Sequence, residues 1–360
     1  PGGGEDYGAY LAPCELPMEV VRRACRDAKN NTSVMKELGL CFGAYDLQGG
    51  RNNMEDKVSA REIMLDKTAK AGFFAVYDGH GGDQASTMLQ LNLHAALSHQ
   101  AGFFADPGAA IVRAAHEMDY QILQAAAKVI DKKNTEVQAG KKKMGLLRTS
   151  RKAANEDNHL SGSTGAFVVV SKAPGAARAT CHVCWVGDSR IVLSTDGGKA
   201  RGVSEDHKAS RADEKKRIRD AGGTVDRKDR LYGDLAVSRA FGDIYHKGDV
   251  EEGDPETFVK RIATELDVGD CMELQRGALI CTPDIVAHTM VEEDEFFIIA
   301  SDGVWDVLSN QEAVNFVRQM LVQGKGVGRA VKELVKFALH RGSIDNVSAV
   351  LVLLNQTFDA

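Results

Sequence analysis

Three aspartates in distant parts of the chain each stand where an apolar run meets a turn. Asp78 and Asp302 follow such a run and precede a glycine, and Asp345 stands just before the last run. Carboxylates gathered within a few ångströms repel one another unless a cation neutralises them. Mg²⁺ and Mn²⁺ prefer carboxylate, carbonyl and water oxygens, so the pattern favours a hard divalent cation. The simpler alternative is that each aspartate ends a strand at the protein surface.

The stretch after Asp78 carries further groups that could serve chemistry. Gly79, His80, Gly81 and Gly82 follow it directly. Glycine adopts backbone conformations closed to other residues and lets a ligand approach the main chain, so a carbonyl here could bind a cation. On this stretch alone, His80 is equally well a turn residue.

A cation and two adjacent carboxylates stand ahead of the strand expected at 58–64. Arg51 comes first, and Glu55 and Asp56 follow it. Neighbouring residues of a strand point to opposite faces, so the two carboxylates need not act together. A charged turn between two strands explains the same residues equally well.

Several other kinds of reactive site are absent from the sequence. Cys181 and Cys184 form a CxxC, but on a strand that spacing places them on opposite faces, and no second CxxC exists, so zinc is not expected. There is neither an HExxH motif nor a GxxxxGK followed by Ser or Thr. No cysteine stands in a phosphate-cradling loop that ends in arginine, and Ser163 has no general base near it in sequence.

Composition describes an ordinary globular protein. The 360 residues are 43% hydrophobic and 27% charged. The formal net charge of -6 does not suggest a nucleic-acid partner, and the absence of 18 consecutive apolar residues predicts no membrane span. Seven cysteines favour free thiols in a reducing compartment, and we expect the protein in the cytoplasm or nucleus. We also expect it to be a monomer. Any targeting signal upstream of Pro1 is not visible.

Apolar periodicity outlines the elements that must position these residues. It predicts helices over 17–38, from Gly82 toward 99, and over 107–130, 310–322 and 328–340, and strands over 40–47, 58–64, 73–77, 166–170, 180–186, 191–193, 295–300 and 347–353. The strands before Asp78 and Asp302 are continuous apolar runs, which indicates burial on both faces. Strands 180–186 and 191–193 are expected to form a hairpin with Asp188 in its acidic tip.

Two polar stretches interrupt this pattern. Residues 131–160 are rich in Lys and Arg, and residues 244–276 are irregular and acidic. We expect both to be insertions that lie outside the core motifs. The basic stretch is interpreted as a solvated loop, with a basic docking patch as the alternative.

Seven motifs, taken in order, resemble those of the metal-dependent PP2C-type (PPM) serine/threonine phosphatases. They are Arg51-x-x-Met54-Glu55-Asp56, Asp78-Gly79-His80-Gly81-Gly82, Ser161-Gly162-Ser163-Thr164, Gly187-Asp188-Ser189-Arg190, Leu235–Asp243, Ser301–Asp306 and Asp345-Asn346-Val347. The resemblance covers about residues 40 to 354 and implies hydrolysis of phosphoserine and phosphothreonine in a phosphorylated protein substrate.

The resemblance also implies a fold and a division of the chain. The family fold is α+β, a four-layer αββα sandwich in which helices flank two antiparallel β-sheets. Residues 1–39 would form an N-terminal tail and helix, and residues 40–357 the phosphatase domain with both insertions and a flap near 204–230. Ala209 stands in that flap where the family more often has proline, which puts substrate choice in doubt rather than catalysis.

The same resemblance assigns a two-metal site for Mg²⁺ or Mn²⁺. Asp78 would bridge the two cations, and Asp302 and Asp345 would complete the first. The carbonyl of Gly79 would bind the second, and Glu55 would hold it directly or through water.

The remaining roles concern the substrate and the surroundings of the metals. Arg51 would grip the substrate phosphate, and a water between the metals would attack phosphorus in line with the leaving oxygen. His80 would protonate that oxygen as a general acid. The residues implied to support these ligands or to bind a weaker third cation are Asp56, Asp188, Asp306 and Asn346.

Two alternatives come from other functional classes. A catalytically weak or inactive PP2C-like binding or scaffold module would be expected to lose metal carboxylates, whereas Asp78, Asp302 and Asp345 are all present. A metal-dependent nuclease would need a basic groove, which the 45 basic against 51 acidic residues disfavour.

Overall fold

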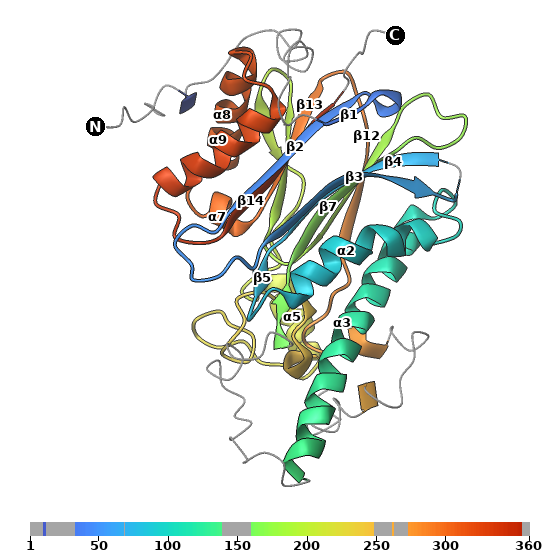
Figure 1. The fold of residues 1–360 in the computed structure, drawn as a ribbon, viewed down its shortest axis with the longest axis vertical. Coiled ribbons are helices and arrows are strands. Elements are labelled where there is room, and N and C mark those ends of the chain that lie inside the picture. The colour runs from blue at the N-terminus through green and yellow to red at the C-terminus, as the bar shows by residue number, and fades with distance from the viewer. Residues whose placement is uncertain are drawn as a thin grey trace.

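Two antiparallel sheets pack face to face in the computed structural model, which describes residues 10–11, 33–67, 69–138, 160–247, 261–262 and 273–354 (Figure 1). One sheet has the order β1 (Ser33–Met35), β2 (Leu40–Leu47), β14 (Val347–Leu353), β13 (Asp294–Ala300), β9 (Arg190–Thr195) and β10 (Lys199–Gly202). The other has the order β12 (Asp284–Thr289), β8 (Thr180–Val186), β7 (Gly165–Ser171), β4 (Ala69–Tyr77) and β3 (Lys57–Leu65).

Helices cover the outer face of each sheet (Figure 1). The six-stranded sheet packs against α7 (Asp302–Trp305), α8 (Asn310–Val322) and α9 (Val327–His340), and the five-stranded sheet against α2 (Gln84–His99) and α3 (Pro107–Gln138). None of the helices among the described residues is long and apolar enough to cross a membrane.

The layered packing explains why the central strands are apolar without a break. In β13, Phe296 and Ile298 face the helices, whereas Phe297 and Ile299 face the other sheet. Successive side chains of a strand point to opposite faces, so a strand covered on both faces favours apolar residues on both of them. Residues 296–300 of β13 are apolar and buried accordingly, and the acidic Asp294 and Glu295 at its start are buried with His288 and Arg318 as partners.

Smaller elements lie at one end of the sandwich. A three-stranded sheet joins β11 (Phe241–Gly242), β6 (Gly162–Ser163) and β5 (Gly79–His80). In the predicted flap, the structure has the nine-residue helix α5 (Ala212–Asp220) and an isolated bridge between Lys208 and Val237. Short 3₁₀ helices cover Lys36–Leu38, Ile244–His246 and Glu273–Gln275.

The predicted hairpin around Asp188 is wrong. β8 belongs to the five-stranded sheet and β9 to the six-stranded sheet, so the short segment between them crosses from one sheet to the other. Gly187 has a φ of 96°, which this tight passage requires and which glycine adopts without strain. Asp188 therefore stands at the junction of the two sheets.

Two predicted segment boundaries also differ from the structure. The helix expected over 17–38 is wrong at its end, because β1 and a 3₁₀ turn occupy 33–38; residues 17–32 lie outside the described residues. The loop expected from 131 is helical as far as Gln138, since lysine, glutamate and glutamine are residue types with good helix propensity. The rest of that insertion, 139–159, and most of 244–276 lie outside the described residues.

The CxxC cysteines lie as the strand period predicts. Cys181 belongs to the core between the sheets, and Cys184 to the core between the five-stranded sheet and its helices. Both are buried free thiols, as are Cys41 and Cys281.

Candidate metal centre

Carboxylates from both sheets converge at one edge of the sandwich. Asp78 follows β4 of the five-stranded sheet, whereas Asp302 follows β13 and Asp345 precedes β14 of the six-stranded sheet. Burial, followed by the charges of Asp56, Asp302, Asp188 and Asp345, raises the pKa of Asp78 well above its ordinary value. The fold thus brings together the three aspartates that the sequence places at strand ends.

The neighbouring carboxylates share this unfavourable environment. Burial and the charges of Asp345 and Asp306 raise the pKa of Asp302 to about 6. Burial and the charge of Asp302 raise the pKa of Asp188 to about 7. Lys208 of the flap acts in the opposite direction on Asp188 and Asp302 without cancelling either shift.

Asp56 is the most enclosed member of the group. Its side chain is 1% exposed, and neither carboxylate oxygen has a hydrogen-bond partner among the described residues. Burial, together with the charges of Asp302 and Asp345, raises the pKa of Asp56 to about 7; the Ser301 and Ser348 side chains lie near enough to oppose this shift in part, although neither makes a well-formed hydrogen bond to the carboxylate. A buried carboxylate without partners is costly unless a cation compensates it.

These residues fit hard divalent cations. The donor set is oxygen throughout, and its mutual repulsion is what a 2+ charge would relieve. Within the described part of the chain, no three acidic, histidine or cysteine side chains are arranged as a ready-made metal site. Mg²⁺ commonly keeps several water ligands, so a few protein oxygens suffice.

Asn346 fastens the Arg51–Asp56 loop to the start of β14. Its Oδ1 accepts a hydrogen bond from the Glu55 N–H at 2.7 Å. Its Nδ2 donates to the carbonyls of Gln48 at 2.7 Å and Asn53 at 2.9 Å. Asn346 therefore acts through its amide, by placing the loop beside the aspartates.

Glycine is required at position 79 because Glu55 approaches its backbone. A side chain on Gly79 would overlap the Glu55 carbonyl, which also accepts a hydrogen bond from Ser86 Oγ at 2.5 Å. The Glu55 carboxylate interacts with the Gly82 N–H and with the charges of His80 and Arg51, and burial raises its pKa. Glu55 thus lies against the glycine-rich turn.

Arg51 lies at the exposed rim of this group. Its Nη2 is 2.5 Å from Asp345 Oδ2, and its side chain is 59% exposed. Asp306 is also exposed, at the C-terminal end of α7, and its charge acts on Asp302.

His80 is held by a carboxylate that the sequence did not single out. Its Nε2 is 2.8 Å from Asp243 Oδ2, and Asp243 is 5% exposed with a left-handed backbone. Gly162 lies between them in the small sheet, where any side chain would overlap both groups. Burial alone would lower the pKa of His80, but Asp243 raises it above its ordinary value. Asp243 belongs to the Leu235–Asp243 motif, yet no local spacing connects it to His80.

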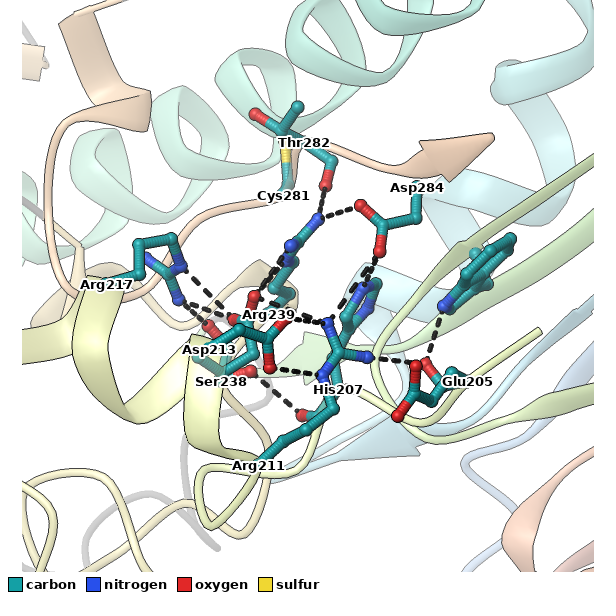
Figure 2. Close-up of polar contacts among 12 residues, drawn as sticks. Glu205, His207, Arg211, Asp213, Arg217, Ser238, Arg239, Cys281, Thr282 and Asp284 are labelled. Atoms are coloured by element: carbon teal, nitrogen blue, oxygen red, sulfur yellow. Dashed lines mark hydrogen bonds and ion pairs between the residues drawn. The ribbon is translucent and has the colours of Figure 1, made fainter. Parts of the chain in front are cut away.

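A second polar cluster was also missed; this flap cluster joins Glu214 and His207 of the flap to Arg239 and Asp284 (Figure 2). Arg239 donates to Glu214 Oε1 at 2.6 Å and to Asp284 Oδ1 at 2.7 Å. His207 Nε2 lies 3.1 Å from Asp284 Oδ2, and its Nδ1 accepts a hydrogen bond from the Gly187 N–H at 3.1 Å. The cluster therefore supports the segment that carries Asp188.

The ionisation of this cluster is the reverse of that at the metal centre. Burial opposes the charge on Glu214, yet hydrogen bonds from Arg239 and Arg217 lower its pKa to about 2. The hydrogen bond with His207 and the charge of Arg239 lower the pKa of Asp284.

Comparison with known proteins places this site in a family. A family model for protein phosphatase 2C matches residues 41–347. The chain belongs to the protein phosphatase 2C family. Family membership supports protein serine/threonine phosphatase activity, and the recognition of PP2C motifs in the sequence is confirmed.

Plant relatives show how far the likeness to other protein phosphatase 2C sequences extends. "Probable protein phosphatase 2C 59" of Arabidopsis thaliana is 31% identical over 313 residues, covering 86% of this chain and 78% of that protein. "Probable protein phosphatase 2C 7" of Oryza sativa subsp. japonica is 30% identical over 312 residues, but this chain spans only 64% of its length.

Solved phosphatase structures share the fold. A phosphatase from a pathogenic strain of Toxoplasma gondii matches with a TM-score of 0.64 and 20% identity, over 90% of this chain and 95% of that one. The serine-threonine phosphatase 2C from Toxoplasma gondii matches with a TM-score of 0.60 and 19% identity, over 90% and 97%. The predicted α+β sandwich is therefore confirmed.

Proposed function

We propose that this protein phosphatase 2C hydrolyses phosphoserine and phosphothreonine in proteins with two divalent cations, Mg²⁺ or Mn²⁺. The observation that carries the proposal is the meeting of Asp78, Asp302 and Asp345 from two sheets, with Arg51 and His80 at the same edge. When bound, the cations would supply positive charge and would lower the pKa of a water, so that a nucleophile able to attack phosphorus exists near neutral pH.

The residues around the cations would have separate roles in metal binding and phosphate binding. Asp78, Asp302, Asp345, Glu55 and the Gly79 carbonyl would hold the two cations, and Asp188 with Asp306 a weaker third. Arg51 presents an exposed guanidinium, whose planar fork of donors suits a phosphate. It would hold the phosphate so that the leaving oxygen of serine or threonine points away from the attacking water.

His80 would give its proton to the leaving oxygen. Asp243 holds the imidazole through its Nε2 atom, and Nδ1 is the other ring nitrogen that can carry a proton. General acid catalysis of this kind is typically worth about 10²–10⁴-fold. Asp243 would therefore orient the ring without touching the substrate.

The decisive experiment is hydrolysis of a phosphothreonine peptide by the full chain. Activity should vanish with a chelator and return with added Mn²⁺ or Mg²⁺. A folded protein that stays inactive in every metal would contradict the proposal and favour a PP2C-like binding or scaffold module.

The acid role has a separate test. His80→Ala should slow hydrolysis of phosphothreonine more than that of p-nitrophenyl phosphate, because a phenolic leaving group needs less protonation. Equal losses on both substrates would count against His80 as the acid.

A further inference from the structure

Ile344 is an apolar side chain left in water beside the metal centre. It is 77% exposed, more than any other large hydrophobic residue in the described ranges; Leu91 follows at 58%. It belongs to none of the apolar clusters of the described residues. Single exposed apolar residues are ordinary, so the surroundings of Ile344 must decide its meaning.

The backbone of Ile344 is anchored on the side of α9. The chain leaves this helix through Gly342, whose φ is 98°. The Gly342 N–H donates to the Leu339 carbonyl at 3.0 Å, and the Ser343 N–H to the Ala338 carbonyl at 3.1 Å. Such backbone bonds close the end of a helix and fix the direction of the following residues.

The glycine turn before Arg51 holds the same segment from the other side. A side chain on Gly50 would lie 3.0 Å from the Ile344 carbonyl oxygen, and one on Gly49 would overlap the Asp345 carbonyl. The segment is thus packed between a helix end and a turn that allows no Cβ. The Ile344 side chain is presented outward by a fixed backbone.

The position of Ile344 connects it with substrate. The next residue, Asp345, pairs with Arg51 at 2.5 Å. A phosphorylated residue held by Arg51 would bring the flanking residues of its chain across this rim. An apolar side chain gains most by covering an exposed isoleucine, since the free-energy gain grows with the apolar surface removed from water.

We propose that Ile344 is a substrate-contact residue that selects phosphoproteins carrying an apolar side chain near the phosphorylated residue. The inference rests on the proposed phosphatase function and adds to it a preference among protein substrates. The contact contributes to peptide binding and takes no part in the reaction at phosphorus.

The test uses phosphothreonine peptides with a serine background. A single leucine occupies, in turn, each of the three positions before and after the phosphothreonine. Values of kcat/KM are measured in Mn²⁺ for the wild type, for Ile344→Ser and for Leu91→Ser, the matched control on α2. p-Nitrophenyl phosphate, which has no flanking residues, provides the reference rate.

The wild type should prefer leucine over serine at one position by about fivefold, which corresponds to partial burial of one aliphatic side chain. Ile344→Ser should lose that preference through KM, measured relative to p-nitrophenyl phosphate, and Leu91→Ser should keep it. An unchanged profile in Ile344→Ser, or a wild type indifferent to leucine, overturns the inference while leaving the phosphatase function intact. A wild type inactive on every substrate overturns both.

Discussion

Two groups of buried carboxylates in this protein have opposite ionisation. At the metal centre, the pKa values of Asp56 and Asp188 are raised to about 7. In the flap cluster, the pKa of Glu214 is lowered to about 2. Burial penalises the charged form in both places, so the difference lies in the neighbours.

The flap cluster contains its own cations, whereas the metal centre does not contain enough. Arg239 makes two hydrogen bonds to Glu214 Oε1, at 2.6 and 3.1 Å. The aspartates of the metal centre mostly face one another, with Arg51 and Lys208 at the margin. The flap cluster is stabilised by its own arginines and is therefore structural. The aspartates of the candidate metal centre lack enough positive side chains, so they are suited to binding cations from solution.

The largest effect should come from removing a carboxylate that the metal centre needs. Asp78→Ala should reduce kcat on a phosphothreonine peptide about 10³-fold, because cation-based charge stabilisation is worth several kcal/mol. The assay is run in saturating Mn²⁺, with the exposed Asp220→Asn as control. Near-normal turnover of the variant would contradict the assignment of Asp78 as a metal ligand.

The flap cluster should respond in stability instead. Glu214→Gln should lower the free energy of unfolding by about 3 kcal/mol, because Arg239 and Arg217 would lose the buried carboxylate they share and Arg239 would keep only the partly exposed Asp284. Denaturant unfolding measures this value, and metal should not alter the difference. Asp220→Asn, which breaks the exposed pair with Lys216, is the matched control and should cost less than about 1 kcal/mol. A loss no larger than in the control would contradict the comparison.

Removing a charge from the candidate metal centre should stabilise the protein against unfolding when no metal is present, whereas removing one from the flap cluster destabilises it. Asp302→Asn should raise the unfolding free energy of the metal-free protein by about 1 kcal/mol, since it relieves repulsion among like charges. Thermal unfolding after exhaustive dialysis against chelator tests this. The variant should also lose most of the stabilisation that Mg²⁺ gives the wild type. Destabilisation of the metal-free protein would show that Asp302 is held by structural contacts instead.

The flap cluster should also respond to pH. The pKa of Glu214 is depressed to about 2, so its contribution to stability is present above its unfolded pKa and is lost as pH falls toward 2. The stability difference between wild type and Glu214→Gln should therefore shrink by up to about 1 kcal/mol per pH unit between pH 4 and pH 2. A constant difference over that range would mean that Glu214 contributes by shape and not by charge.

The metal-centre aspartates were predictable because their signal is local. Asp78 and Asp302 end strands buried on both faces, and such strands are continuous apolar runs in the sequence. The long last strand and the helices before it were equally clear, because their periodicity is strong over many residues.

Long-range pairing left no such signal. His80 and Asp243 are 163 residues apart, and nothing in the sequence around either one specifies the other. The crossover at Asp188 was mistaken for a hairpin because a short glycine turn serves both connections equally. The start of the basic stretch was mistaken for a loop because a solvated helix end is as polar as a loop.

The two cysteines of β8 give separate reporters on the two packed interiors. Cys181 is enclosed between the sheets and Cys184 between sheet and helices, although three positions separate them in the chain. In variants that keep Cys181 or Cys184 as the single cysteine of the seven, the rate of thiol labelling would measure how often each interior opens. Since the proposed metal ligands come from both sheets, bound cations should slow labelling at Cys181 more than at Cys184.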